Sequence, residues 1–371
     1  MPKYSYRIYH ENVSLGPEIL ENIKEIVIDQ EIDIAWECRI SFSIFLDSNG
    51  NWSSETDELL KSFTRIRVEI QSRDGLYVPL IDGPVVGYEF YMSSEPGESS
   101  VIIIIQDDSV LLNLNDEITK FEKMTDDQIV LQIFNNYSLV PEIETQNIKN
   151  PSINPPLDFV QRGTAIQVLK NLANRQGMIA YILPGQVPGK STGCFCNFPT
   201  EPDDLSPLIL LGTDRNIEYF TVKNDAQKLS KIEAASMNID SKEITTSTSD
   251  IQDITLLGDE VGSESALEPP IRRLPPHQNE IVDLDNAVLA ETKRSSYTIH
   301  AEGKVLTDKY FDILRPYKVV SVYGVKPNIS GNFLIMGVSH KITPSQYNQT
   351  FRLLRNARTA GNSKISVGGL F

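Results

Sequence analysis

The stretch VQRGTAIQVLKNLANRQGMIAYIL, from Val160 to Leu183, combines a helical pattern with a strand pattern. The apolar side chains Ile166, Leu169 and Leu172 recur at helical spacing, and Gly177 stands where a helix commonly ends in a left-handed residue. The six residues MIAYIL that follow are typical of a short buried strand. The stretch therefore predicts an isolated helical unit in a chain whose other segments mostly have strand patterns.

Residues 1 to about 115 have the pattern of an antiparallel β-structure, with six strand-like runs at short spacing. The run from Arg65 to Ile70 alternates polar and apolar residues, which predicts one face toward a core and the other toward water or a neighbour. The turn sequences DSNGN (47–51) and SRDG (72–75) separate strands. Together these signals favour a barrel or a sandwich.

The pattern changes between about residue 116 and residue 183. The segment MTDDQIVLQIFNNYSL predicts a helix that begins after Thr125, a good N-cap, with aspartates in its first turn. Its apolar stripe contains Ile129, Ile133 and Phe134. With the helix after Thr164 and the short strands beside it, this region is predicted to form a compact α/β insert.

The second half of the chain returns to strand patterns after a segment, 184–206, whose composition predicts a loop. A second polar, loop-rich region covers about 240–280, and DLDNAVLAETKR predicts a short helix. From Ser296 onward the pattern is again β, and the last two strands are expected to form a hairpin around Thr343–Gln346. The predicted fold is mainly β with an α/β insert (α+β) and contains two β-rich sections of comparable size. The chain divides into 1–115 (first β-rich section), 116–183 (insert), 184–285 (strands and long loops), 286–358 (second β-rich section) and 359–371 (tail).

The composition limits the classes of partner. The 371 residues carry a formal net charge of −16, which argues against nucleic acid as a specific partner, because phosphates require Lys and Arg. The longest apolar run, VIIIIQ, is far shorter than the ~20 residues that span a bilayer, and the start has no signal-peptide pattern. We therefore expect no membrane span and synthesis in the cytoplasm. The acidic residues concentrate in the first third, whereas 293–358 is net basic and ends in three candidate assembly-contact residues, Arg352, Arg355 and Arg358.

The sequence offers no recognisable catalytic, metal or cofactor centre. None of the four histidines has a companion at ligand spacing, and Cys194 and Cys196 form a single C-x-C pair that we interpret as reduced thiols in a loop. Adjacent carboxylates could supply the acid and nucleophile of a glycosidase, but such pairs are common in turns and helix starts. The three pairs are Asp107–Asp108, Asp126–Asp127 and Asp203–Asp204.

The order of segments resembles the phage late control protein D family, the baseplate hubs of contractile tails and related injection systems, which includes the hub portion of VgrG proteins. The resemblance covers about residues 5 to 358. Tyr317 stands where the family usually has glycine in L-R-P-G, so we expect a turn of another type there. Met178 replaces the usual aromatic residue after Gly177. The matching segments are SLGPEILENIKEIVIDQEIDIAWECRISFSIFLD, RIRVEIQSRDGLYVPLIDGPVVGYEFYMSSEPGESSVIIIIQDDS, MTDDQIVLQIFNNYSLVPEI, VQRGTAIQVLKNLANRQGMIAYIL and ILRPYKVVSVYGVKPNISGNFLIMGVSHKITPSQYNQTFRLLRNA.

The resemblance implies a structural protein and not an enzyme. It implies a homotrimer in which each subunit supplies two similar barrels, forming a pseudo-six-fold ring around a channel, with the tail tube protein on one face and the spike on the other. Because the sequence ends soon after the last matching segment, the spike is expected to be a separate chain. The tail residues that could dock it are Ile365, Val367, Leu370 and Phe371.

Two alternatives follow from the same pattern. A tail-associated carbohydrate-active or peptidoglycan-degrading enzyme would need an acid/base pair of carboxylates. A monomeric β-rich module that binds a host surface would need no assembly partner. Both a phage tail and a domesticated injection device use the same hub, so the sequence does not separate them.

Overall fold

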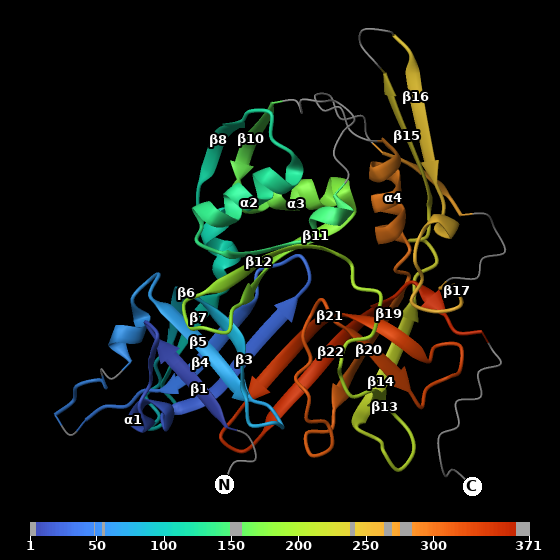
Figure 1. Ribbon diagram of the computed structural model, residues 1–371. Coiled ribbons are helices and arrows are strands. Elements are labelled where there is room, and N and C mark those ends of the chain that lie inside the picture. Colours follow the sequence, from blue (N-terminus) through green and yellow to red (C-terminus); the bar gives the residue numbers. More distant parts are fainter. Residues whose placement is uncertain are drawn as a thin grey trace.

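The computed structural model of the chain describes residues 5–47, 49–53, 56–148, 158–237, 242–262, 269–274 and 284–360. Within these ranges there are twenty-three strands and four α-helices, so the predicted mainly β architecture with a helical insert is confirmed. Thirteen of the strands belong to one large sheet. Figure 1 shows this sheet across the lower half of the molecule, with the long helices above it.

A first four-stranded unit contains strands predicted in the N-terminal third. In spatial order these are β3 (Ile23–Glu31), β4 (Glu37–Ser43), β7 (Ser100–Gln106) and β6 (Tyr77–Tyr91). Their inward-facing residues Ile26, Ile40 and Ile103 are completely buried. Beyond β6 the sheet continues through β5 (Arg65–Gln71), β1 (Tyr6–His10) and β2 (Val13–Ser14), and the short helix α1 (Pro17–Leu20) leads into β3. The alternating pattern thus provides the core face of this unit.

A second four-stranded unit is built from the C-terminal half. In spatial order its strands are β14 (Ile217–Asn224), β19 (Ile299–Val305), β22 (Tyr347–Arg355) and β21 (Gly331–Ile342). The hairpin predicted around Thr343–Gln346 joins β21 to β22 and is confirmed. Phe333, Phe351 and Leu353 are completely buried in this unit's own core. Two further strands, β20 (Val319–Tyr323) and β13 (Leu208–Ile209), extend it beside the first part of β21.

The two units have the same topology. In each, the spatial order of the strands is first, second, fourth and third along the chain. In each, a register shift interrupts the pairing of the first and second strands, after Ile23 in β3 and after Ile217 in β14. A further shift occurs just before a glycine of the third strand, Gly87 in β6 and Gly337 in β21. A bulge occurs at a specific position of a strand pair. Because both bulges lie at equivalent positions in the two units, the units form a structural repeat.

The repeat also holds residue by residue across the strands. Each position of the first unit therefore has an equivalent position in the second. The rows of paired residues that show this run Tyr88–Ile103–Ile40–Ile26 in the first unit and Val338–Phe351–Gly303–Phe220 in the second.

The two units join into one continuous sheet through β21. Its segment Gly337–Ile342 pairs antiparallel with Ile26–Glu31 of β3. The path of paired strands then begins at β14 and ends at β2 without returning to its start. The described residues therefore form no closed barrel, and the two predicted barrels are two similar units of an open sheet. The pattern of alternation could not show this, because closure depends on pairing between distant strands.

The insert lies above the first unit (Figure 1). Both predicted helices are present and begin as expected: the amide of Thr125 donates to Gln128 at 3.1 Å, and the amide of Thr164 donates to Gln167 at 3.2 Å. Gly177 ends the second helix with a φ of 66°. The elements are α2 (Asp126–Asn136), α3 (Ala165–Gln176), the pair β8 (Asp116–Phe121) and β10 (Phe159–Thr164), and the sheet of β9 (Val140–Ile143), β11 (Met178–Pro184) and β12 (Ser191–Asn197).

Strand β12 corrects the prediction of a loop over 184–206. Its residues pair with β11 from Met178–Asn197 to Pro184–Ser191. Gly193, which weakened the strand signal, allows Phe134 of α2 to pack against the strand, because a Cβ at this glycine would lie 2.7 Å from the phenyl ring. The insert sheet therefore extends past residue 183, while the division of the chain into domains stays a prediction.

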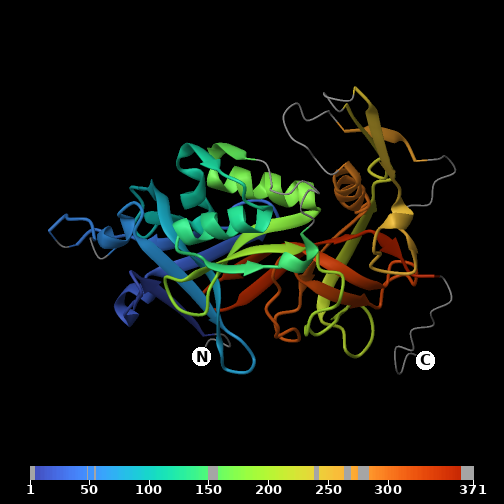
Figure 2. The ribbon, with the colours of Figure 1, turned by 45° about the horizontal axis from the view of Figure 1, so that its top comes forward.

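A smaller group of elements lies on the same side of the sheet, next to the insert (Figure 2). It contains the predicted third helix, α4, and strands within the region predicted to be loop-rich. Ala290 of α4 approaches Gly177 at the end of α3, and Arg294 donates to Asn174 at 2.6 Å. The elements are α4 (Leu284–Ser295), β15 (Lys231–Met237), β16 (Ile244–Ser249), β18 (Ile271–Arg273), and the pair β17 (Glu260–Val261) and β23 (Ala357–Arg358).

Candidate assembly surfaces

The three arginines predicted to make assembly contacts lie in different environments. Arg355 is 1% exposed, donates to backbone carbonyls of neighbouring loops, and has its pKa lowered to about 10 by burial. Arg352 is about half exposed on the outer face of the sheet and pairs with Glu31 at 2.9 Å. Arg358 is mostly covered and pairs with Glu260 at 3.3 Å. An assembly contact stays a prediction for all three, and the placement favours Arg352.

The C-terminal tail is described only at its first two residues. The hydroxyl of Thr359 donates to the carbonyl of Ser330, and the amide of Ala360 donates to Asp259 at 3.0 Å. These contacts attach the end of β23 to neighbouring loops. The residues predicted to dock a spike lie outside the described residues and stay a prediction: Ile365, Val367, Leu370 and Phe371.

The first acidic pair has structural contacts on both members. Asp107 accepts from the amides of Trp36 and Ser109 at 2.6 and 2.8 Å, and burial raises its pKa to about 6. Asp108 accepts from both terminal nitrogens of Arg65, at 3.0 and 2.5 Å. Both carboxyl groups are buried and hold chain segments together.

The other two pairs are placed in a similar way. Asp126, at the start of α2, accepts from Arg175 and Gln176 at the end of α3. Asp203 accepts from the amide of Val319 at 2.8 Å and pairs with Lys318 at 3.1 Å. These contacts are those of helix and loop anchors, and the geometry does not favour a glycosidase pair.

The histidines and cysteines also have local partners. His340 is completely buried between the hydroxyl of Tyr347, 2.7 Å from Nδ1, and the side chain of Gln30, 3.2 Å from Nε2; burial lowers its pKa to about 3. Both ring nitrogens of His340 therefore have hydrogen-bonding partners within the chain. Cys194 and Cys196 are free thiols, as predicted, but lie in β12 and not in a loop, and burial raises the pKa of Cys196 to about 12.

Two searches of the described ranges gave negative results. In this part of the chain no three His, Cys, Asp or Glu side chains are grouped so that they could hold a metal ion. The same ranges contain no helix that is both long and apolar enough to cross a membrane.

A buried ionic network joins the first unit to the insert. Arg67 is 1% exposed, pairs with Glu69 at 2.7 Å and Asp82 at 2.9 Å, and donates to the carbonyls of Gly185 and Gln186 in the β11–β12 turn. Of the two surroundings that the alternation allowed for the polar face of β5, water or a neighbour, the structure shows a neighbour. The turn of the insert covers this face, and the buried charges are paired, as buried charges need to be.

Tyr317, which stands where the resembled family usually has glycine, links the insert to the large sheet. It has a φ of 65°, in the left-handed region that glycine favours. Its ring stacks on Tyr181 of β11, with centroids 3.6 Å apart, and its hydroxyl accepts from the amide of Asp33 at 3.1 Å. These contacts offset the cost of a positive φ in a side chain with a Cβ.

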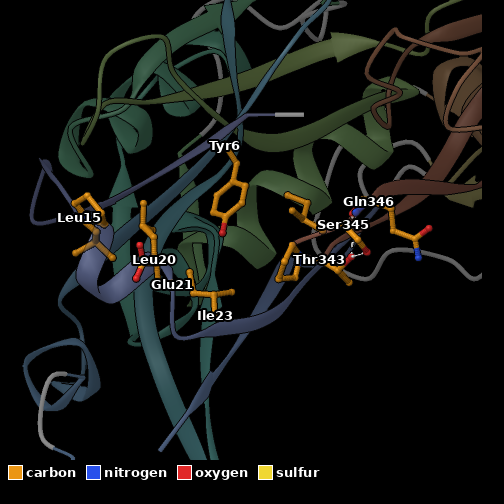
Figure 3. Close-up of a pocket in the computed structure, with 11 residues that line it drawn as sticks. Tyr6, Leu15, Leu20, Glu21, Ile23, Thr343, Ser345 and Gln346 are labelled. Atoms are coloured by element: carbon orange, nitrogen blue, oxygen red, sulfur yellow. Dashed lines mark hydrogen bonds between the residues drawn. The ribbon is translucent and has the colours of Figure 1, made fainter. Parts of the chain in front are cut away.

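An apolar groove of about 490 Å³ opens at one end of the first unit (Figure 3). Tyr6, Leu15, Leu20 and Ile23 line one side, and the β21–β22 turn, Thr343–Gln346, lines the other. The groove thus lies in the gap between β1 and β21, where a closed barrel would be sealed. Its lining is apolar, with Glu21 as the one charged residue among its lining residues.

The two outer edges of the units are exposed. Among the described strands, Gly87–Tyr91 of β6 pairs only with β7, and β14 pairs only with β19. Free sheet edges are pairing sites that proteins normally cover or protect. The β6 edge carries four neighbouring large apolar side chains that are 45–59% exposed, namely Tyr88, Phe90, Tyr91 and Met92. Exposed apolar patches of this kind mark interaction sites.

Comparison with known proteins gives matches in structure alone. No protein-family model and no curated protein matches the sequence. The structure is similar to the 43 kDa tail protein of prophage MuSo2 from Shewanella oneidensis (14% identity, 95% of this chain and 99% of that chain, TM-score 0.64). It is also similar to the tail protein from Neisseria meningitidis MC58 (14%, 95% and 96%, TM-score 0.62).

A third similar structure comes from a secretion system. The c3393 protein of E. coli is described as a component of the type VI secretion system with similarity to the T4 bacteriophage tail proteins gp27 and gp5; it is 11% identical over 97% of this chain and 80% of that chain, with a TM-score of 0.54. These likenesses confirm the fold expected from the order of the sequence segments. At such low identities they show the fold alone.

Proposed function

We propose, because this chain has a fold like those of phage tail proteins and baseplate hubs, that it is a structural hub joining the six-fold tail tube to the three-fold spike. The system would be a contractile phage tail or a phage-tail-like injection system. The observation that carries the proposal is the structural repeat, in which β3–β4–β7–β6 and β14–β19–β22–β21 have the same order and register. Three copies would present six similar units to a six-fold tube while keeping a three-fold axis for a spike.

The partners follow from this role. The hub would be a homotrimer that contacts the tail tube protein on one face, a separate spike protein on the other, and further baseplate components at its periphery. Neither specific nucleic acid binding nor a cofactor is part of the proposal, and the role is structural and not enzymatic. The protein would assemble in the cytoplasm and then be part of the particle.

The insert has a supporting role in this proposal. Its α2–α3 layer has its own apolar core, and the β11–β12 turn contacts the first unit through the buried Arg67 network. The stacked pair Tyr181–Tyr317 adds a second attachment. Such contacts would keep the first unit in a fixed orientation when load passes from tube to spike.

The test is the mass and symmetry of the purified protein, alone and with its candidate spike partner. Light scattering would give the subunit number, and class averages of negatively stained particles would give the symmetry. We expect a ring of three subunits with six peripheral lobes. A persistent monomer in both preparations would overturn the hub proposal and favour the surface-binding alternative.

A further inference from the structure

Strand edges that are equivalent in the two units have different surroundings. In the second unit, the outer edge of β21 is covered, because Gly337–Ile342 pairs with β3 of the first unit. The equivalent edge in the first unit, Gly87–Tyr91 of β6, has no partner among the described strands. Likewise β3 is covered, and its equivalent β14 has a free edge. We call the pairing of edge strands from two units a seam. One chain therefore contains one formed seam, between β21 and β3, and the two unpaired edges, β6 and β14, of a second.

We infer that the two free edges pair with each other between copies, so that β14 of one subunit adds to β6 of the next. The formed seam supplies the register. In it, Ser339 pairs with Asp29 and His340 pairs with Ile28. The equivalent pairs between copies are Glu89 with Lys223 and Phe90 with Val222.

The chemistry of the two edges fits this register. Glu89 and Lys223 are both exposed and would lie directly opposite each other with opposite charges, a favourable cross-strand pair. Phe90 and Val222 are 45% and 36% exposed and would form an apolar pair. The register was derived from bulges and strand pairs, and not from these side chains, so their complementarity is independent support.

The exposure of the aromatic residues on β6 is explained by the same seam. Tyr88 pairs with the completely buried Ile103 and so lies on the core side of the sheet, yet it is 50% exposed. Its equivalent in the formed seam, Val338, is 2% exposed. The difference is the covering strand, which β3 provides for Val338 and which a second copy would provide for Tyr88. Buried apolar surface at this position would contribute most of the affinity.

The pairing joins two unlike edges, so it is a head-to-tail contact. Contacts of this kind form rings if the rotation between copies closes. The inference deepens the proposed hub function, on which the number of three copies rests. It adds the strands, the direction and the register of the subunit contact.

Cysteine cross-linking tests the register directly. In the inferred pairing, Cα atoms of opposed residues lie about 4.5–5.5 Å apart, within the range that a disulfide bridges. The double variant Glu89→Cys with Lys223→Cys is expected to give covalent ladders of subunits after mild oxidation. The matched control is Glu89→Cys with Val222→Cys, whose side chains would point to opposite faces and which should stay uncross-linked. The three native cysteines are buried, which keeps the background low.

Charge reversal provides a second readout. Glu89→Lys and Lys223→Glu are each expected to raise the dissociation constant of the assembly at least about tenfold. The double reversal is expected to restore most of the lost affinity between copies. Glu89 also accepts from Arg39 at 2.7 Å within the chain, so circular dichroism would confirm that each variant is folded.

The outcomes separate this inference from the proposed function. A ring that assembles but gives no Glu89→Cys/Lys223→Cys cross-link, or that cross-links equally in the control, would overturn the inferred pairing and leave the hub proposal in place. A protein that stays monomeric in every preparation would overturn both.

Discussion

The equivalent edge positions of the two units carry different residues, the polar His340 on β21 and the apolar Phe90 on β6. His340, on β21, is completely buried and bonded to Gln30 of the neighbouring β3 and to Tyr347 of β22. Phe90, on β6, is 45% exposed. A seam that forms within one chain can include a buried polar residue, because its hydrogen-bonding partners are always present. A seam that forms between copies is better served by an apolar residue, because its burial on assembly favours association and leaves no polar group in need of a partner.

The largest expected effect concerns the support of the first unit by the insert. Arg67→Ala would leave the buried Glu69 without its partner and Asp82 with Arg65 and the amide of Gly189. We expect a cost of about 3–5 kcal/mol in the free energy of unfolding. Lys341→Ala removes only the half-exposed pair with Glu25 and should cost less than about 1 kcal/mol. Urea unfolding of both variants measures the difference. Equal effects would contradict a bracing role for the buried network.

A substitution of His340 tests whether the seam between β21 and β3 depends on a buried polar residue. His340→Phe places the residue of the free edge into the formed one and removes the hydrogen bonds that His340 makes with Gln30 and Tyr347. We expect a loss of about 1–3 kcal/mol, measured by urea unfolding. A variant as stable as the natural protein would show that the choice between polar and apolar residues does not depend on the seam.

The same residue predicts a pH dependence. Because the pKa of His340 is lowered to about 3 in the folded chain, the unfolded chain binds the extra proton first as pH falls below about 6.5. The stability contribution of the neutral histidine is therefore present above pH 6.5 and is lost progressively toward pH 3.

The difference between two proteins isolates this effect. Asp107, whose pKa is raised to about 6, acts in the opposite direction, since the folded chain holds its proton more tightly, but it is common to the natural protein and to His340→Phe. Stability curves of both between pH 7 and pH 4 should therefore converge as pH falls. Parallel curves would contradict the buried, neutral state of His340.

Tyr317 tests the attachment of the insert to the seam region. Tyr317→Phe keeps the stacking on Tyr181 and removes only the hydroxyl that accepts from Asp33. A single hydrogen bond of this kind should contribute about 0.5–1.5 kcal/mol to the free energy of unfolding. Thermal unfolding followed by calorimetry measures it, and no change would mean that the stack alone orients this turn.

The smallest effect is expected on the free edge. Phe90→Ser removes an exposed side chain and should change the free energy of unfolding of the dissociated chain by no more than about 0.5 kcal/mol. His340→Ser, at the equivalent covered position, serves as the comparison and should cost more. Measuring both in the Glu89→Lys background, at concentrations where the chain is dissociated, keeps assembly out of the comparison. A large loss for Phe90→Ser would show that this edge already has a partner within the chain.

Local signals in the sequence were sufficient for the helices and most strands. Thr125, Thr164 and Gly177 mark helix boundaries through bonds to residues within one turn, so their effect does not depend on the rest of the molecule. Strand β12 was missed, because Gly193 and its neighbours have a loop composition and become a strand only through β11 and Phe134.

The candidate surfaces were harder to predict than the elements. Alternation along β22 places Arg355 on the same face as Phe351 and Leu353, opposite to Arg352. The enclosure of Arg355 by loops from other parts of the chain has no such local signal. Arg67 belongs to an alternating strand whose polar face normally contacts water, and a turn more than a hundred residues away covers it. Burial of this kind depends on long-range contacts, for which a single sequence has no local signal.

The strand periods, the helix caps and the order of segments that resembles the baseplate hubs can be read from the chain alone, because each depends on neighbouring residues or on their order. That the two strand-rich halves are a repeat in one open sheet, with β21 covered and β6 free, became visible with the folded structure. Strand pairing is made by backbone hydrogen bonds, which every residue except proline offers alike. Which strands pair, and in which register, is therefore decided when the whole chain packs.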